Sequence, residues 1–349
     1  MAARWTNRPE GSNWGDFGPD DQLGRINLLT PERVVEAVKE VKTGKSFCLS
    51  LPLDLPGGRA LNPRRFPPKL YATARERTGL SNYNFTASSE SPGMTDVISD
   101  DSVLMSLQYS TQWDSFAHVG SQFDANGDGI AEIVYYNGWN GLEHLIAPTE
   151  DLEADPLQRF PGVRAKALGI ETMAETCVQG RGVMIDLRKH LGDDRTVVDF
   201  AMLEKIMADD DVVVEEGDMV CVHTGFSQRL MDMAGNPDPE VLHKGCATLD
   251  GGDPRLQDWI RDTGLSVLIG DNYAVEEIPN PRAKAGKPPL MPIHELCLFK
   301  LGIHLGEMFY LTELAEWLAA NGRSRFLLTA PPLRLPGAVG SPATPVATV

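Results

Sequence analysis

Residues 108–118 bring several reactive side chains together in a short stretch of sequence. They read Gln-Tyr-Ser-Thr-Gln-Trp-Asp-Ser-Phe-Ala-His and include the amides of Gln108 and Gln112, the carboxylate of Asp114 and the imidazole of His118. Carboxylates bind divalent cations, amide oxygens are weaker ligands, and a histidine is either a further ligand or a base that titrates near neutral pH. The stretch is therefore a candidate metal or catalytic site, with a hydrogen-bonded polar strand edge as the alternative.

An apolar run just before these residues predicts the strand that positions them. The run contains Val103, Leu104, Met105 and Leu107. Because residues two apart in a strand share a face, Gln112 and Asp114 should project together, and His118 continues the same parity. Such a line of polar groups needs a metal ion, a ligand or a hydrogen-bond network as its partner.

Length and composition describe an ordinary globular protein. The chain has 349 residues, of which 42% are hydrophobic and 23% charged, enough for one large domain spanning residues 1–349. A net charge of −17 argues against a nucleic-acid surface and against an anionic membrane surface. With no apolar run long enough to cross a bilayer and no apolar signal-peptide core near Met1, we expect a cytoplasmic protein that acts on a small molecule.

Two segments between residues 30 and 100 have clear local patterns. Thr30 is a helix N-cap, Pro31 fits the first helical position, and an apolar stripe leads to Gly44, which predicts a helix ending there. Residues 50–100 are rich in Pro, Gly, Arg and Ser, which predicts a long loop with little regular structure. Such loops are usually functional, so this one should cover a pocket or form an oligomer contact.

The second half of the chain alternates predicted strands and helices, which indicates an α/β fold. Strands are expected at residues 182–187, 218–225 and 266–271, and helices at residues 199–207, 253–264 and 292–302. His223 and Asp271 stand at strand ends, where polar residues often face a site. His294 lies in the first turn of the last of these helices, and Glu307 follows it.

The stretch at residues 108–118 resembles the motif His-x-Gly-Thr-His-x-Asp-x-Pro-x-His of the putative cyclase family, which contains the bacterial kynurenine formamidases and the isatin hydrolases. Three motif positions match, namely Thr111, Asp114 and His118. Four differ: Gln108 and Gln112 replace histidines that are metal ligands in the family, Ser110 replaces Gly, and Phe116 replaces Pro.

Other blocks of the chain resemble the same family in the same order. The Asn-Trp-Gly and Asn-Leu-Leu-Thr-Pro-Glu blocks resemble its N-terminal part, which implies that Trp14 or Phe17 walls the substrate pocket. Tyr136 and Asn137 resemble an element near the active site. The segment with His294 and Glu307 is similar to the second metal half-site, and residues 332–343 resemble the family's ending. Aromatic residues near the motif, such as Trp113, indicate a planar ring in the substrate.

The resemblance implies a fold, a cofactor and an activity. The fold would be a mixed, β-barrel-like sheet with helices packed outside it, in a homodimer or higher homo-oligomer. One divalent cation per chain, Mn²⁺ or Zn²⁺, would be held by Asp114, His294 and Glu307, with Gln112 or Gln108 adding an amide oxygen or orienting a water. Loss of two imidazoles favours manganese over zinc.

The implied reaction is hydrolysis of a C–N bond in a cyclic amide, imide or aryl formamide, or of a lactone, with His118 as the acid/base residue. Two alternatives from other classes remain at this point. The glutamines could have abolished metal binding and left a small-molecule-binding pseudo-enzyme, or His118 and Asp114 could act without metal as the acid/base pair of a lyase or isomerase. The presence of Asp114, His118, His294 and Glu307 together favours the hydrolase.

Overall fold

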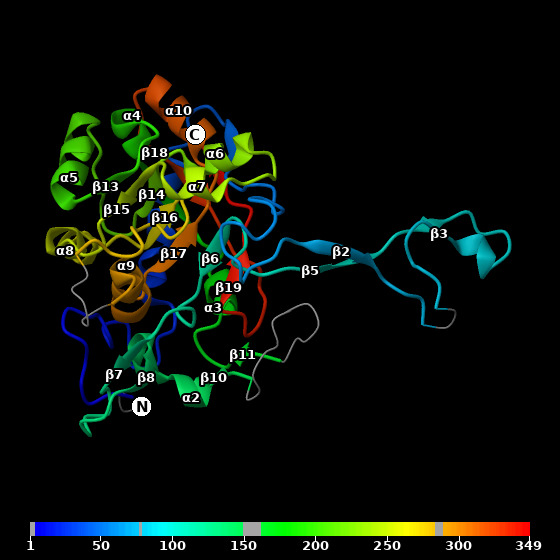
Figure 1. Ribbon diagram of the computed structural model, residues 1–349, viewed down its shortest axis with the longest axis horizontal. Helices are drawn as coiled ribbons and strands as arrows, with labels where there is room; N and C mark the ends of the chain where they lie inside the picture. Colours follow the sequence, from blue (N-terminus) through cyan, green and yellow to red (C-terminus); the bar gives the residue numbers. More distant parts are fainter. Residues whose placement is uncertain (1–3, 77–78, 149–161, 283–288) are drawn as a thin grey trace.

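A curled, mixed sheet of nine strands forms the centre of the computed structural model, which describes residues 4–76, 79–148, 162–282 and 289–349 (Figure 1). The strands, in spatial order, are β1 (Ser46–Cys48), β20 (Val346–Thr348), β18 (Arg325–Thr329), β12 (Gln179–Asp186), β14 (Met219–His223), β16 (Val267–Gly270), β17 (His304–Glu307), β6 (Gln112–Asp114) and β19 (Gly340–Pro342). Strands β12, β14, β16 and β17 are parallel, and the outer pairings are antiparallel. The predicted α/β fold with a mixed, barrel-like sheet is confirmed.

One face of the sheet packs against α5 (Phe200–Asp209), α8 (Pro254–Asp262) and α9 (Pro292–His294). The strand residues that point to this face are apolar and buried: Val183, Ile185, Val220, Val222, Leu268 and Leu305. The alternate strand residues, among them Met184, Cys221 and Ile269, pack on the other face against α3 (Ile170–Glu175) and α10 (Thr312–Ala320). A residue's parity along its strand therefore decides which of two hydrophobic cores it joins.

The helix starts predicted from the sequence agree with the structure, whereas the predicted helix ends agree less well. The Thr30 hydroxyl accepts a hydrogen bond from the backbone N–H of Arg33, and the Asp253 carboxylate accepts one from that of Arg255, as N-caps do. Helix α1 (Pro31–Val38) stops short of Gly44, so that prediction was wrong. The physical reason is tertiary, because the backbone N–H of Gly44 donates to the carbonyl of Val349 beside β1.

The helix predicted at residues 292–302 exists but changes its winding. Helix α9 continues into η4 (Glu295–Leu301), a π-helical segment whose wider turns the sequence pattern does not reveal. Gly302 ends it in the left-handed region with φ 56°, as predicted. A Cβ at this position would lie 2.6 Å from the ring of Tyr136, so the close contact also requires glycine.

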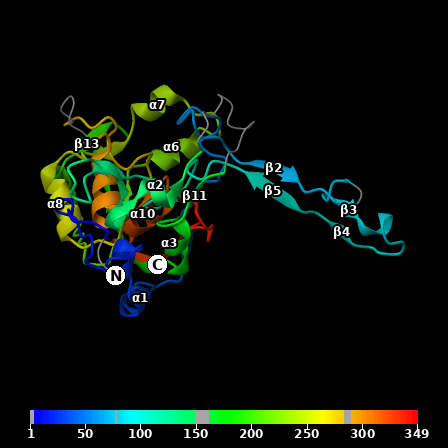
Figure 2. The ribbon, with the colours of Figure 1, turned by 90° about the horizontal axis from the view of Figure 1, so that it is seen from below.

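A two-stranded arm projects far from the body of the protein (Figures 1 and 2). Its strands are β2 (Lys69–Ala72) with β5 (Asp101–Leu104), and farther out β3 (Phe85–Thr86) with β4 (Val97–Ile98). Residues 50–100 were predicted to form a long loop with little regular structure, and the structure has only short elements here, with irregular stretches between them. Their Pro- and Gly-rich composition gave no sign of pairing between strands about 30 residues apart in the sequence.

The remaining elements are short and lie around the sheet, except for η2 (Ala87–Ser89), which lies in the arm between β3 and β4 (Figure 1). They are η1 (Gly24–Leu28), η2, η3 (Tyr136–Gly138), α2 (Gly141–His144), α4 (Leu187–Leu191), α6 (Phe226–Asp232), α7 (Pro239–His243), β7 (Ser121–Phe123), β8 (Glu132–Tyr135), β9 (Trp139–Asn140), β10 (Leu145–Ile146), β11 (Arg164–Ala165), β13 (Thr196–Val198) and β15 (Ala247–Leu249). None of the helices in the described ranges is both long and apolar enough to cross a membrane.

Candidate metal centre

Strand β6 points Gln112 and Asp114 to the same face of the sheet, as their spacing predicted. Both side chains are fully buried. Trp113 lies between them and points to the opposite face, where its indole N–H donates to the carbonyl of Ala330 over 2.7 Å and its ring packs edge-on against Phe309. The structure therefore does not bring Trp113 to the polar group, because it has the other strand parity.

Glu307, the last residue of β17, is the cross-strand partner of Gln112. The amide nitrogen of Gln112 donates to Glu307 Oε2 over 3.0 Å and lies 3.5 Å from Asp114 Oδ1. Gln112 thus joins the two carboxylates through its N–H groups. This arrangement holds the carboxylates at a fixed separation inside the protein.

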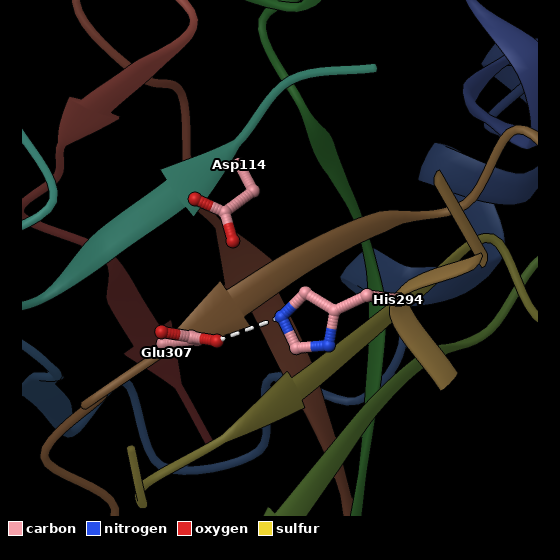
Figure 3. A group of neighbouring side chains, drawn as sticks. All are labelled: Asp114, His294 and Glu307. Carbon is pink, nitrogen blue, oxygen red and sulfur yellow. Dashed lines mark hydrogen bonds and ion pairs between the residues drawn. The ribbon is translucent and has the colours of Figure 1, made fainter. Parts of the chain in front are cut away.

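His294 comes from α9 and completes the group, which Figure 3 shows converging from three elements. Its Nε2 lies 3.2 Å from Glu307 Oε1, and its Nδ1 lies 2.8 Å from Glu276 Oε1. The Glu276 carboxylate also accepts the backbone N–H groups of Ile293 and His294. Glu276 therefore fixes both the start of α9 and the orientation of the ring, so that Nε2 faces the other carboxylates.

Glu276 was not predicted from the sequence as a residue of the site. It is nearly fully buried and lies in the loop after β16, 18 residues before its partner. A carboxylate close to an expected metal-binding histidine is common, because such histidines usually donate their second ring N–H to an oxygen acceptor. The spacing in the chain does not by itself identify which carboxylate does so.

The donor atoms fit a single cation. One ligand atom from each of Asp114, His294 and Glu307 lies within 4.8 Å of the others, comparable to the roughly 4 Å between donors that bind one ion over about 2.0–2.2 Å. Asp114 Oδ2 and Gln112 Oε1 are buried and lack a hydrogen-bond partner in the described part of the chain. Buried oxygens without partners are costly, and a cation would satisfy them.

The electrostatics of the group also favour a cation. Burial raises the pKa of Asp114, and the nearby charge of Glu307 raises it further. Burial alone would raise the pKa of Glu307, but the hydrogen bond and charge of His294 outweigh burial and lower it. His294 has its pKa raised to about 10, because its contacts with Glu276 and Glu307 outweigh burial. A positive charge is therefore held between the carboxylates, as a proton or as a metal ion.

His118 lies at the solvent side of the group. It follows β6 in a turn, and its backbone N–H donates to the carbonyl of Ser115, so strand parity does not continue to it. Its Nε2 is nevertheless 3.9 Å from Asp114 Oδ1, and its side chain is 23% exposed. It is thus placed where an incoming substrate could reach it.

Gln108 lies beside the group without a hydrogen bond to it in the described residues. Its backbone carbonyl accepts a 2.6 Å hydrogen bond from Arg65 Nη1. Its side chain passes Gly340, the cross-strand partner of Asp114, where a Cβ would come within 2.5 Å of the amide nitrogen. Arg65 was not predicted, yet its charge lowers the pKa of both Asp114 and Glu307.

Trp14, Tyr136 and Asn137 fix the N-terminal segment in place. Trp14 is fully buried, donates to the carbonyl of Phe299 over 2.7 Å and packs edge-on against that ring, which supports η4. The amide of Asn137 bonds to the backbone of Gly15 and Gly18, and the hydroxyl of Tyr136 bonds to Asp21. These contacts are structural. Phe17 is only half-buried in a turn of the same segment.

His223 and Asp271 lie at the same end of the strands as Glu307 but in a different group. His223 Nδ1 is 2.8 Å from Asp186 Oδ1, and its Nε2 is 3.1 Å from the hydroxyl of Thr312 in α10. Asp271 accepts three hydrogen bonds from the backbone and hydroxyl of Thr224 and the backbone of Gly225. His223 and Asp186 have the parity of Cys221 and Met184 and therefore face α10. The structure does not bring them to the metal group.

Comparisons with known proteins agree with this architecture. A family model described as putative cyclase matches residues 49–277, more than half of the chain. A solved structure described as a novel cyclase is 29% identical with a TM-score of 0.72, over 97% of this chain and 99% of the other. No curated protein matches the chain.

Two isatin hydrolase structures share the fold at low identity. Isatin hydrolase A from Labrenzia aggregata, bound to benzyl benzoate, is 14% identical with a TM-score of 0.54, over 90% of this chain and 97% of its own. An isatin hydrolase bound to the product analogue thioisatinate is 13% identical with a TM-score of 0.55, over 92% of this chain and 99% of its own.

Proposed function

The chain belongs to the putative cyclase family, and from that premise we propose that it is a metal-dependent hydrolase of a small, ring-containing substrate. The bond cleaved would be the C–N bond of a cyclic amide, imide or aryl formamide, or the ester bond of a lactone. The observation that carries the proposal is the buried convergence of Asp114, His294 and Glu307, in which Asp114 Oδ2 has no hydrogen-bond partner among the described residues.

Asp114, His294 and Glu307 would hold one divalent cation, manganese or zinc. Two of the three candidate ligand atoms are carboxylate oxygens and the third is a ring nitrogen, and oxygen-rich groups suit manganese. A bound cation supplies Lewis acidity, which polarises a carbonyl oxygen and makes a water molecule more acidic. Glu276 holds the imidazole of His294 so that Nε2 is directed toward the cation's place.

His118 would move the proton in the reaction. It would take a proton from the attacking water and return it to the leaving nitrogen or oxygen. Its position supports this role, because it is the one partly exposed histidine next to Asp114 among the described residues. Both proton transfers need a side chain that is accessible to the substrate and close to Asp114. His294 is buried and therefore does not meet the first requirement.

Gln112 would position the carboxylates. Its amide nitrogen contacts both Glu307 and Asp114, at the position where the family motif has a histidine. An amide donor neutralises no charge, but it keeps the carboxylate oxygens from separating. The carbonyl oxygen of Gln112 is buried, has no hydrogen-bond partner in the part of the chain that the structure describes, and would be available to the cation or a water molecule.

We also propose that the protein acts as a homodimer or higher homo-oligomer joined through the arm. The arm exposes large apolar side chains, including Leu70, Tyr71, Val97 and Val103, each at least half exposed. An isolated two-stranded hairpin is marginally stable in water. A cavity of about 790 Å³ at its base is lined by Leu70 and Val103 of the arm together with Pro331 and Leu333 of the body, and this apolar cavity is where we propose that a second copy binds. Light scattering on a Leu70→Asp, Val103→Asp variant should report dissociation to monomer.

Metal content tests the proposed function directly. Elemental analysis of purified wild-type protein should find about one manganese or zinc per chain, and hydrolysis of isatin and formanilide should be measured on the same samples. Asp114→Asn and His294→Ala should each lose the metal and the activity. Wild-type protein that takes up no metal on supplementation would contradict this mechanism and favour the metal-free alternatives.

A further inference from the structure

Arg65 is an unusual arginine for so acidic a protein. The chain has 49 acidic and 32 basic residues, yet no carboxylate oxygen of the described residues lies within 4.0 Å of its guanidinium. Its one hydrogen-bond acceptor in the described chain is the carbonyl of Gln108. A guanidinium has five N–H donors in a planar fork, so most of its donors have no protein partner.

The surroundings of Arg65 place it beside the metal group. Gln108 leads into β6, and Gln108 lies against the strand partner of Asp114. A small cavity of about 10 Å³ next to Arg65 is also lined by Met308, which follows Glu307, and by Tyr273. The guanidinium carbon lies 5.7 Å from the centre of the Tyr273 ring. Arg65 therefore lies close to β6 and β17, the strands that carry the candidate ligands Asp114 and Glu307.

The backbone around Arg65 is held firmly, which is what a binding residue requires. The amide of Asn62 donates to the hydroxyl of Tyr273 over 2.9 Å, and the backbone N–H of Phe66 donates to the hydroxyl of Ser106 over 3.0 Å. The side chains of Asn62 and Phe66 are themselves buried. A half-buried arginine on an ordered segment loses little conformational freedom when a ligand binds.

We propose that Arg65 binds a carboxylate of the substrate, so that the protein acts on amides or lactones that carry an anionic carboxylate close to the scissile carbonyl. The proposal rests on the hydrolase function above and narrows its substrate class. A planar guanidinium with unused donors matches a carboxylate in a bidentate contact.

Binding of benzoate tests the site without relying on catalysis. Isothermal titration calorimetry on the metal-supplemented protein should find benzoate bound and its neutral isostere benzamide bound at least about tenfold more weakly. Arg65→Gln keeps a donor for the Gln108 carbonyl but removes the charge, and should weaken benzoate binding by about tenfold or more, with benzamide unaffected. Arg65→Lys should restore part of the affinity. The exposed neighbour gives the matched control, Arg64→Gln, which should bind benzoate as the wild type does.

Kinetics separate this proposal from the hydrolase proposal. The wild type should prefer 2-formamidobenzoate over formanilide in kcat/KM, and Arg65→Gln should remove that preference. Equal binding of benzoate and benzamide by the wild type, or unchanged benzoate binding in Arg65→Gln, would overturn the role of Arg65 and leave the hydrolase intact. Benzoate binding that depends on Arg65, in a protein that hydrolyses no substrate, would instead preserve the anion site and refute the hydrolase.

Discussion

The sheet carries a histidine between carboxylates on each of its two faces, and the two groups differ in how completely their polar atoms are bonded. On the face of α10, His223 uses both ring nitrogens, on Asp186 and Thr312, and the carboxylate of Asp271 accepts three hydrogen bonds. On the face of α9, His294 also uses both ring nitrogens, but Asp114 Oδ2 is buried and has no partner within the described ranges.

This difference separates a group whose polar atoms are satisfied within the protein from the group that we propose binds a cation. A satisfied buried network rigidifies the protein, whereas an unpartnered buried carboxylate costs stability. Both groups contain the residue types expected of a catalytic site, so composition alone does not distinguish them. The same substitution of Asp by Asn on each face, at Asp114 and at Asp186, provides matched variants for comparing them.

The largest expected contrast is in activity. Asp114→Asn should lower kcat/KM by about a thousandfold, because it removes a ligand charge from the group proposed to bind the cation. Asp186→Asn should stay within about threefold of the wild type, since it changes a hydrogen bond on the opposite face. Steady-state kinetics with one substrate measure both. A comparable loss in the two variants would mean that the α10 face takes part in the reaction.

Metal binding should stabilise one variant and not the other. Added manganese or zinc should raise the free energy of unfolding of the wild type and of Asp186→Asn, by about 4 kcal/mol once free metal exceeds Kd about a thousandfold. Asp114→Asn should gain little. Thermal melts with and without a chelator follow the effect. An equal metal-dependent shift in Asp114→Asn would place the cation elsewhere.

In the metal-free protein the two substitutions should change the free energy of unfolding in opposite directions. Asp114→Asn should raise the free energy of unfolding by about 1–2 kcal/mol, because it removes a buried charge next to Glu307. Asp186→Asn should lower it by about 1 kcal/mol, because it weakens the contact with His223. Denaturant titration in a chelator gives both values. The comparison fails if Asp114→Asn destabilises the metal-free protein as much as Asp186→Asn does.

The smallest effect is a pH dependence on the α10 face. Burial alone would lower the pKa of His223, but the hydrogen bond that its ring donates to Asp186 and the charge of Asp271 outweigh burial and raise the pKa above the ordinary 6.5. The stabilisation is therefore fully present below pH 6.5 and is lost as pH rises through the folded-state pKa. The stability difference between wild type and His223→Gln should shrink by about 1 kcal/mol between about pH 6 and pH 9. A difference that is constant across this range would show that His223 stays neutral.

Local patterns in the sequence predicted much of the fold and part of the site. The caps at Thr30 and Asp253 and the shared face of Gln112 and Asp114 follow from rules that act within a few residues. The same parity rule would have directed Trp113 away from the group. His294 and Glu307 were identified through family resemblance, since nothing local distinguishes a first-turn histidine that binds a metal from one that caps a helix.

The features of the site that were not predicted depend on how strands and loops distant in sequence pack together. His223 and Glu307 both end parallel strands at the same edge of the sheet, but a shift of one residue turns them to opposite faces. Glu276 and Arg65 act through partners distant in sequence, in loops whose paths no periodicity describes. The strand pairing of the arm was also not predicted, because β2 and β5 are separated by a long intervening segment.

The position of β6 in the sheet also determines when the metal centre can form. Although β6 lies in the first third of the chain, both of its neighbours, β17 and β19, come from the last sixth or so. During synthesis on the ribosome, Asp114 therefore remains without its sheet partners until nearly the whole protein has emerged. The parallel core of β12, β14 and β16 can assemble earlier, so the cation is expected to bind only in the final stage of folding, after the hydrophobic scaffold is built.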